Sequence, residues 1–166
     1  MANSDWEDIV VANSGAIVSA ALRVLGRLAD AEDVAQDVLV EAFQKWTAKE
    51  EYAWPGLLRR MAVCRSLDLL RATRRFSSLE FQPIDSREAE VSEQLSHQEV
   101  HDRLRSLVVR LPPRESEVFC LACFERLTHE EIAKLLEIPR GAVATLLAKA
   151  RGKMKAIIPI VHGESR

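Results

Sequence analysis

The chain has 166 residues, 48% of them hydrophobic and 29% charged, with a formal net charge of −2, a composition typical of a globular protein with one or two domains. No segment approaches the roughly 18 uninterrupted apolar residues of a membrane span, and the first residues are acidic, so we expect a cytoplasmic protein without a membrane span. The three cysteines and four histidines form no disulfide framework, metal-ligand cluster or pairing with a nucleophile, and we therefore expect no enzyme, no catalytic residue, no metal and no cofactor.

The small net charge conceals blocks of alternating charge. Residues 1–55 hold ten acids and four bases, whereas residues 56–76 hold six arginines and one acid. Residues 77–102 hold seven acids and one arginine, residues 103–137 hold six of each sign, and residues 138–155 hold five bases and no acid. Two basic strips separated by an acidic segment favour two surfaces for a polyanion and an acidic connector, although a solvated charged face is the alternative for any single block.

Three helices are predicted in the first half, because apolar residues recur there at three- and four-residue spacing. The first covers residues 6–25 and ends near Gly26. The second covers residues 30–46, with Asp30 as the N-cap whose carboxylate accepts from the backbone of the first turn. The third begins at Pro55, because proline is favoured at a first helical position, and it ends in a basic segment.

The helical pattern is lost between residue 76 and about residue 96, where serine, proline and aspartate residues indicate a linker. We therefore predict an all-α protein of two small helical domains joined by a flexible acidic linker. The predicted boundaries are 1–76 for the first domain, 77–98 for the linker and 99–160 for the second domain.

The second domain is predicted to contain a helix-turn-helix. A helix over residues 100–110 is stopped by the turn "LPPRE", and a second covers residues 115–123 or 124. Thr128 stands three residues before Glu131, which is the capping-box spacing at the start of a short helix over residues 128–136. A three-residue connection then leads into the basic helix, and a short helix, a tight turn and a basic helix form the arrangement that reads a major groove.

The basic helix divides into two faces. Val143, Leu147, Ala150 and Met154 repeat at helical spacing and should pack against the preceding helices. An ordinary amphipathic helix with a solvated basic face is the alternative interpretation. The opposite face should present Arg140, Ala144, Thr145, Ala148, Lys149, Arg151, Lys153 and Lys155.

Three segments carry a family resemblance. "LPPRESEVFCLACFERLTHEEIAKLLEIPRGAVATLLAKARGKM" resembles the fourth domain of the extracytoplasmic-function sigma factors of bacterial RNA polymerase. "LADAEDVAQDVLVEAFQKW", residues 28–46, resembles the most characteristic stretch of the second domain of the same family, and "LDLLRATRR", residues 67–75, is a weaker match. Together the matches cover nearly the whole chain, in the order and separation that the family has.

The resemblance implies partners for both domains. In this family the second domain binds the clamp of the largest polymerase subunit and melts the minus-ten promoter element. The fourth domain binds the minus-thirty-five element and the polymerase flap, and an acidic linker threads between them. An anti-sigma factor is a further family partner. A plain acidic helix start is the alternative interpretation of the predicted polymerase-docking residues, which are Asp30, Glu32, Asp33, Gln36 and Asp37.

Minus-ten recognition needs aromatic groups for unstacked bases and a basic groove for the backbone. The resemblance places the base-capturing loop at "TAKEEYAWPG", where Tyr52 and Trp54 are the candidates. Both could equally be core anchors at a helix start. Leu57, Val63 and Cys64 stand where the family often has Trp, Arg and Asn. The candidate phosphate contacts are Arg59, Arg60, Arg71, Arg74 and Arg75.

The candidate minus-thirty-five contacts are few. Only Arg140 and Thr145 can hydrogen-bond from the first half of the exposed face, while Ala144 and Ala148 can only contact thymine methyl groups. A good bidentate contact contributes roughly 1–3 kcal/mol of discrimination, so we expect weakly selective binding with much of the affinity from Lys149 and its basic neighbours on phosphates. Where the family commonly has a turn glycine, this chain has Glu137, which costs on the order of 1 kcal/mol if φ is positive there.

Two other functions compete. A stand-alone helix-turn-helix regulator would explain residues 100–155 but leaves residues 30–46 and the acidic linker unexplained. A protein-interaction module that no longer binds DNA is suggested by Ala144 and Leu146, which replace the usual basic residues.

Overall fold

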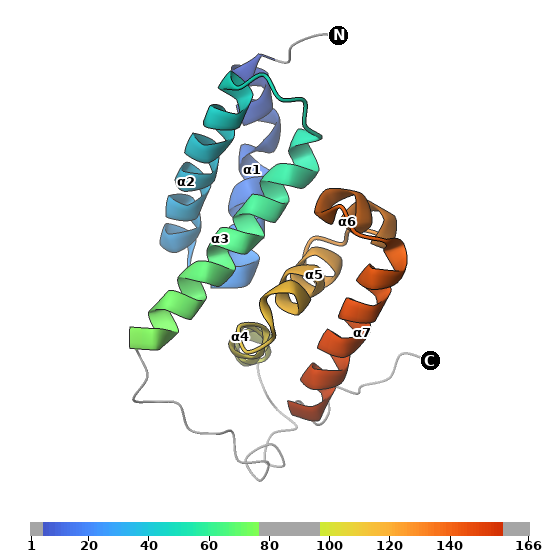
Figure 1. The fold of residues 1–166 in the computed structure, drawn as a ribbon. Helices are drawn as coiled ribbons and strands as arrows, with labels where there is room; N and C mark the ends of the chain where they lie inside the picture. Colours follow the sequence, from blue (N-terminus) through green and yellow to red (C-terminus); the bar gives the residue numbers. More distant parts are fainter. Residues whose placement is uncertain (1–4, 77–96, 158–166) are drawn as a thin grey trace.

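The computed structural model describes residues 5–76 and 97–157 and is built from α-helices. The helices of these two ranges form an N-terminal group (α1–α3) and a C-terminal group (α4–α7), with no strand among the described residues (Figure 1). The all-α prediction is therefore confirmed. The predicted linker falls almost entirely outside the described residues, except that residues 97 and 98 belong to the first turn of α4, and the predicted domain boundaries stay predictions.

The N-terminal group consists of α1 (Trp6–Leu25), α2 (Leu28–Thr47) and α3 (Trp54–Phe76). Helix α1 packs along both α2 and α3, and Ile17, Val38 and Leu58 lie fully buried between them. By length and composition alone, α1 could cross a membrane, but here its most apolar face forms the core of this helix group, which accounts for its composition.

Gly26 ends α1 as predicted, and its backbone conformation favours a glycine there. Its φ is +74°, in the left-handed region that glycine adopts without a steric penalty. An added Cβ would lie 2.6 Å from the guanidinium carbon of Arg105 in α4, so the end of that flexible side chain would have to move. The prediction of Asp30 as an N-cap is wrong, because α2 begins at Leu28 after Arg27. Asp30 lies instead in the first turn, where its charge still favours the positive end of the helix dipole.

The C-terminal group consists of α4 (His97–Val108), α5 (Pro113–Cys123), α6 (His129–Leu136) and α7 (Arg140–Ile157). Helix α4 starts earlier than predicted, and α5 starts at Pro113, because proline fits the first helical turn. Helix α7 packs on α5 and α6. Its predicted apolar stripe, Val143, Leu147, Ala150 and Met154, is buried as expected.

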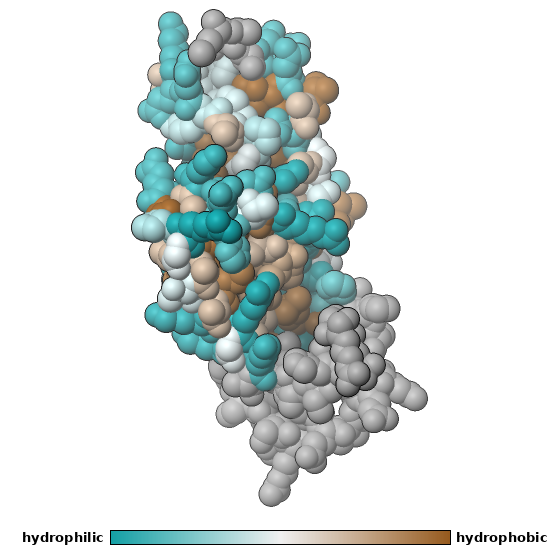
Figure 2. Space-filling model, turned by 90° about the vertical axis from the view of Figure 1, so that its right-hand side faces the viewer, coloured by the Kyte–Doolittle hydropathy of each residue, from teal (hydrophilic) through white to brown (hydrophobic). Residues whose placement is uncertain are grey.

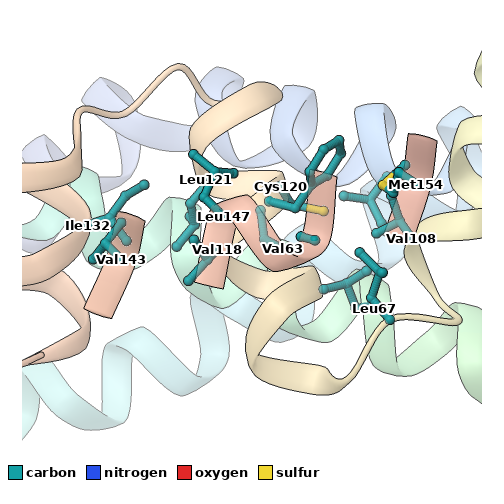
Figure 3. Close-up of a cluster of buried hydrophobic side chains, with 14 of the residues drawn as sticks. Val63, Leu67, Val108, Val118, Cys120, Leu121, Ile132, Val143, Leu147 and Met154 are labelled. Carbon is teal, nitrogen blue, oxygen red and sulfur yellow. The ribbon is translucent and has the colours of Figure 1, made fainter. Parts of the chain in front are cut away.

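The two helix groups are packed against each other through α3. One apolar cluster contains Val63 and Leu67 of α3 together with Val118 and Leu121 of α5 (Figure 3). Val24 of α1 belongs to the same cluster. The C-terminal core therefore continues across the boundary between the two groups, which places α5 and α6 directly over one face of α3.

Candidate nucleic-acid interface

The helix-turn-helix is held by a capping box and a left-handed turn. The Thr128 hydroxyl accepts from the Glu131 backbone at 3.2 Å, and the Thr128 backbone donates to the Glu131 carboxylate at 2.7 Å. These hydrogen bonds hold the pKa of Glu131 below its usual value. Glu137 then adopts φ +55° and ψ +44°, so the residue that replaces the turn glycine sits in the conformation that glycine favours. The turn between α6 and α7 therefore forms without a glycine, at the steric cost of a left-handed backbone conformation at Glu137.

The exposed face of α7 carries the side chains predicted for it. Ala144, Thr145 and Ala148 are exposed, as are Lys149 and Arg151. The side of the molecule that bears α6 and α7 is mainly hydrophilic, with separate hydrophobic patches (Figure 2). The exposed face of α7 therefore has small side chains in its first half, which allow a partner to approach closely, and basic side chains towards its end, which are suited to phosphates.

Several of these polar groups already have partners inside the protein. The Thr145 hydroxyl donates to the Gly141 carbonyl at 2.9 Å, so it can only accept from a base. Arg140 lies 3.8 Å from Glu130, and both side chains are largely exposed. Lys153 contacts both carboxylate oxygens of buried Glu115 at 2.9 Å, an internal pairing that the sequence did not reveal.

The predicted docking residues lie on one side of α2. Glu32, Asp33, Gln36 and Asp37 are exposed around the buried Val34 and Val38. Asp30 is half-buried and lies 3.7 Å from Arg27.

Helix α2 also exposes apolar side chains that the sequence interpretation missed. Val40 is 61% exposed and Phe43 is 44% exposed. Phe43 stacks on Trp46, with ring centroids 5.8 Å apart, and meets Trp6 edge-on at 5.3 Å. An acidic surface and an apolar surface on the same helix are suited to binding another protein.

The aromatic pair predicted to capture bases stands at the start of α3. The rings of Tyr52 and Trp54 meet edge-on with centroids 5.4 Å apart, and both side chains are half-buried. Trp54 packs against the N-terminal core, which favours its role as a core anchor. Tyr52 donates to Glu50, and the ammonium of Lys45 lies over its ring. Because Trp54 packs against the core and Tyr52 does not, Tyr52 is the better candidate to meet a base, although a base on the ring face that Lys45 covers would have to displace that ammonium.

Three of the five predicted minus-ten arginines contact the C-terminal helix group. Arg60 donates to the Glu117 carboxylate at 2.7 Å and to the Leu135 carbonyl at 3.3 Å. Arg71 donates to the Ser116 hydroxyl at 2.6 Å. Arg59 lies 4.0 Å from the Glu125 carboxylate. Arg74 and Arg75 belong to the last turn of α3, and their side chains lie outside the described part of the chain.

Cys64 lies at the same contact between α3 and α5, and its thiol is unreactive. Its thiol donates to the Glu117 carboxylate at 3.3 Å. Burial raises the pKa of this thiol to about 12, and the negative charge of Glu117 adds to the shift. A thiol protonated at neutral pH is a poor nucleophile. Among the residues that the structure describes, no group of three or more His, Cys, Asp or Glu side chains is placed to hold a metal ion.

Comparisons with known proteins identify both halves of the chain. Residues 9–76 match the family model "Sigma-70 region 2", and residues 101–154 match "Sigma-70, region 4". The chain is 24% identical over 155 residues to the ECF RNA polymerase sigma factor SigE of Mycolicibacterium smegmatis. That alignment covers 90% of the chain but 60% of the relative's length.

A solved structure has the same fold. It is the sigma factor RpoE of Bartonella quintana in complex with the anti-sigma factor NepR, with a TM-score of 0.59 and 17% identity. The match covers 95% of this chain and 99% of that one. At this level of identity the likeness concerns the fold.

Proposed function

Because the chain belongs to the sigma-70 family and carries region 2 and region 4 in one polypeptide, we propose that it is an alternative sigma factor of the extracytoplasmic-function type. It directs core RNA polymerase to specific promoters and helps to open the minus-ten region. The observation that carries this proposal is the joint presence of both regions. The region 2 match over residues 9–76 has no role in a stand-alone helix-turn-helix regulator, which disfavours that alternative.

Polymerase docking is assigned to the acidic side of α2. The exposed positions of Asp33, Gln36 and Asp37 support this assignment, and Val40 and Phe43 extend the surface with apolar area. Charged groups contribute orientation and specificity to such an interface, and the desolvated aromatic side chains contribute affinity. The clamp of the largest polymerase subunit is the partner that this assignment requires.

Promoter contact is divided between α3 and α7. The arginines of α3, with Tyr52, bind the melted minus-ten strand, because guanidinium groups hold phosphates and an aromatic ring stacks on an unpaired base. Helix α7 binds the minus-thirty-five element with weak selectivity. The internal bond of Thr145 and the small size of Ala144 and Ala148 support this weak selectivity. A binding-site selection that returned equally sharp motifs for both elements would contradict it.

The remaining proposals concern partners and location. The chain acts in the cytoplasm, where promoters and core polymerase are, and it has no enzymatic activity of its own. An anti-sigma factor is a proposed partner, because the structural neighbour of the same fold was crystallised with one. Region 4 is also proposed to contact the polymerase flap.

The test is initiation by the purified chain with bacterial core RNA polymerase on a library of promoter fragments. An Asp33→Arg variant serves as the comparison, because it reverses one exposed charge of the proposed docking surface. We expect start sites that share an upstream element and are lost in the variant. Duplex binding without core polymerase, together with no initiation in its presence, would instead support the stand-alone regulator.

A further inference from the structure

A cavity rich in arginine lies among α1, α3, α4 and the turn that follows α5. Its volume is about 620 Å³, which is in the size range of pockets for small organic ligands. Among the described residues that line it, the one carboxylate is that of Glu125. A hollow whose lining is mainly of one charge concentrates the electrostatic field and attracts ions of the opposite sign. The arginines of the lining are Arg23, Arg59, Arg105 and Arg126.

The Glu125 carboxylate orients two of these arginines. Its side chain is 3% exposed, and Arg23 donates to it at 2.8 Å. The Arg59 Nε atom lies 4.0 Å from the other oxygen of the same carboxylate. One buried carboxylate therefore fixes two guanidinium groups but neutralises the charge of only one. Both arginine side chains stay partly exposed, at 49% and 37%, and a guanidinium has several N–H donors, so donors remain for a ligand.

Arg105 is held in place before any ligand arrives. Its Nε atom donates to the Arg23 backbone carbonyl at 3.2 Å, and its Nη1 atom donates to Asp102 at 2.9 Å. Gly26 leaves room for this guanidinium, because a Cβ there would lie 2.6 Å from its central carbon. A preorganised donor loses less entropy on binding. With Asp102 counted beside Glu125, four guanidinium groups face two carboxylates, which leaves an excess of two positive charges.

Arg126 is the arginine with the most capacity for an incoming anion. Its side chain is exposed, and within the described part of the chain it makes no hydrogen bond or ion pair. Its backbone is left-handed, with φ +55°, in a turn closed by the Leu127 N–H donating to the Leu121 carbonyl at 3.0 Å. Glycine adopts this conformation more easily, yet the position carries a guanidinium that lines the cavity. Strained backbone of this kind is found at ligand sites.

The cavity also has an apolar wall. Leu22 and Phe124 line it, and both side chains are half-buried. The Phe124 ring meets that of Phe119 edge-on, with centroids 6.0 Å apart, which holds its orientation. An inorganic anion would contact the arginines and leave this wall in water. A molecule with both phosphates and an aromatic ring would use the two parts of the lining together.

We propose that this cavity binds a nucleoside polyphosphate. Arg23, Arg105 and Arg126 hold the phosphates, since guanidinium groups form paired, charge-assisted hydrogen bonds with phosphate oxygens. The base packs against Leu22 and Phe124. The site is separate from the basic face of α7. Binding requires neither polymerase nor promoter DNA, so its test is independent of the proposed function.

The first measurement is isothermal titration calorimetry of the full chain with ATP, GTP and inorganic tripolyphosphate, without added divalent cations. Tripolyphosphate carries the phosphates without the base. We expect at least one nucleotide to bind at least about tenfold more tightly than tripolyphosphate, because only the nucleotide can bury an aromatic ring against Leu22 and Phe124.

A pair of charge-matched variants tests the arginines. Arg126→Gln should weaken nucleotide binding about tenfold, because a charge-assisted contact is lost. Arg27→Gln removes the same charge from a side chain that is 79% exposed at the start of α2 and does not line the cavity. This control should bind the nucleotide within about twofold of the unchanged chain. Thermal melts of both variants check that each remains folded.

Nuclear magnetic resonance locates the binding. On addition of the nucleotide, the backbone amide signals of Ser19, Arg23 and Phe124 should shift, because these residues line the cavity. The amide signals of Lys149 and Arg151 serve as the internal control, since α7 carries the other basic surface. Shifts centred on α7 would assign the binding to its basic face and overturn the inference.

Four results in calorimetry would also overturn it. They are binding of neither nucleotide with a Kd below about 1 mM, tripolyphosphate binding as tight as that of both nucleotides, and an Arg126→Gln variant that binds as well as the Arg27→Gln control. The fourth is a short oligothymidylate that binds more tightly than either nucleotide with the same dependence on Arg126, which would assign the cavity to nucleic acid. Failure of the chain to initiate with core polymerase would refute the proposed function and leave the nucleotide site standing.

Discussion

The ion pair between Arg60 and Glu117 should be strongly coupled, and a double-mutant cycle can measure it. The Arg60 Nε atom lies 2.7 Å from the Glu117 carboxylate, and the two side chains are 32% and 10% exposed. At an effective dielectric constant of 20, opposite charges about 4 Å apart attract by roughly 4 kcal/mol. Desolvation of the buried carboxylate offsets more than half of this, so we expect a coupling free energy of about 1–2 kcal/mol.

The chain supplies a matched control ion pair with the same shortest distance and more exposed side chains. Arg65 Nη2 and a Glu41 carboxylate oxygen also lie 2.7 Å apart, but their side chains are 43% and 38% exposed. An exposed pair should couple by about 0.2–1 kcal/mol. Urea unfolding of the two single alanine variants and the double variant of each pair gives both coupling energies. Because the two distances are equal, any difference between the two coupling energies reflects the difference in burial of the side chains.

Salt provides a second comparison within the same cycle. At high ionic strength the coupling of the exposed pair should nearly vanish, whereas that of Arg60 and Glu117 should largely persist, because screening acts mainly through solvent. Equal couplings for the two pairs, or a loss of both in salt, would show that the contact between the helix groups is as weak as a surface ion pair.

Four further predictions concern the helix-turn-helix. Glu137→Gly should stabilise the chain by about 0.5–1 kcal/mol in urea unfolding, since relief of the left-handed strain exceeds the added flexibility of the unfolded chain; a loss of stability would contradict this. Thr128→Ala should destabilise it by about 1 kcal/mol in the same assay, through loss of the capping box. The pKa of Glu131 is lowered in the folded chain, so its stabilising contribution is present above the ordinary glutamate pKa and is lost as the pH falls through the lowered value. In urea unfolding at several pH values, Glu131→Gln should therefore make the free energy of unfolding fall less steeply towards acid pH. Lys149→Ala should make the negative slope of log affinity for duplex DNA against log salt concentration less steep by about 1, without changing the preferred sequence. Binding titrations at several salt concentrations check this.

Local features of the fold could be predicted from the sequence because their causes are local. Gly26 marked the end of α1, and the spacing of Thr128 and Glu131 marked the start of α6. The apolar stripe of α7 needed only the helical period. The prediction of Asp30 as an N-cap was wrong because any aspartate near a helix start fits that pattern. The N-cap is Arg27, whose backbone is extended, and α2 begins at Leu28.

The contact between the helix groups could not be predicted in the same way. Glu117 lies 57 residues from Arg60, and Glu125 lies 102 residues from Arg23. In the sequence, residues 103–137 balance six acids against six bases and suggest no preferred partner. Val63 and Cys64, noted only as departures from the family pattern, lie at this contact, and their meaning depends on what packs against them.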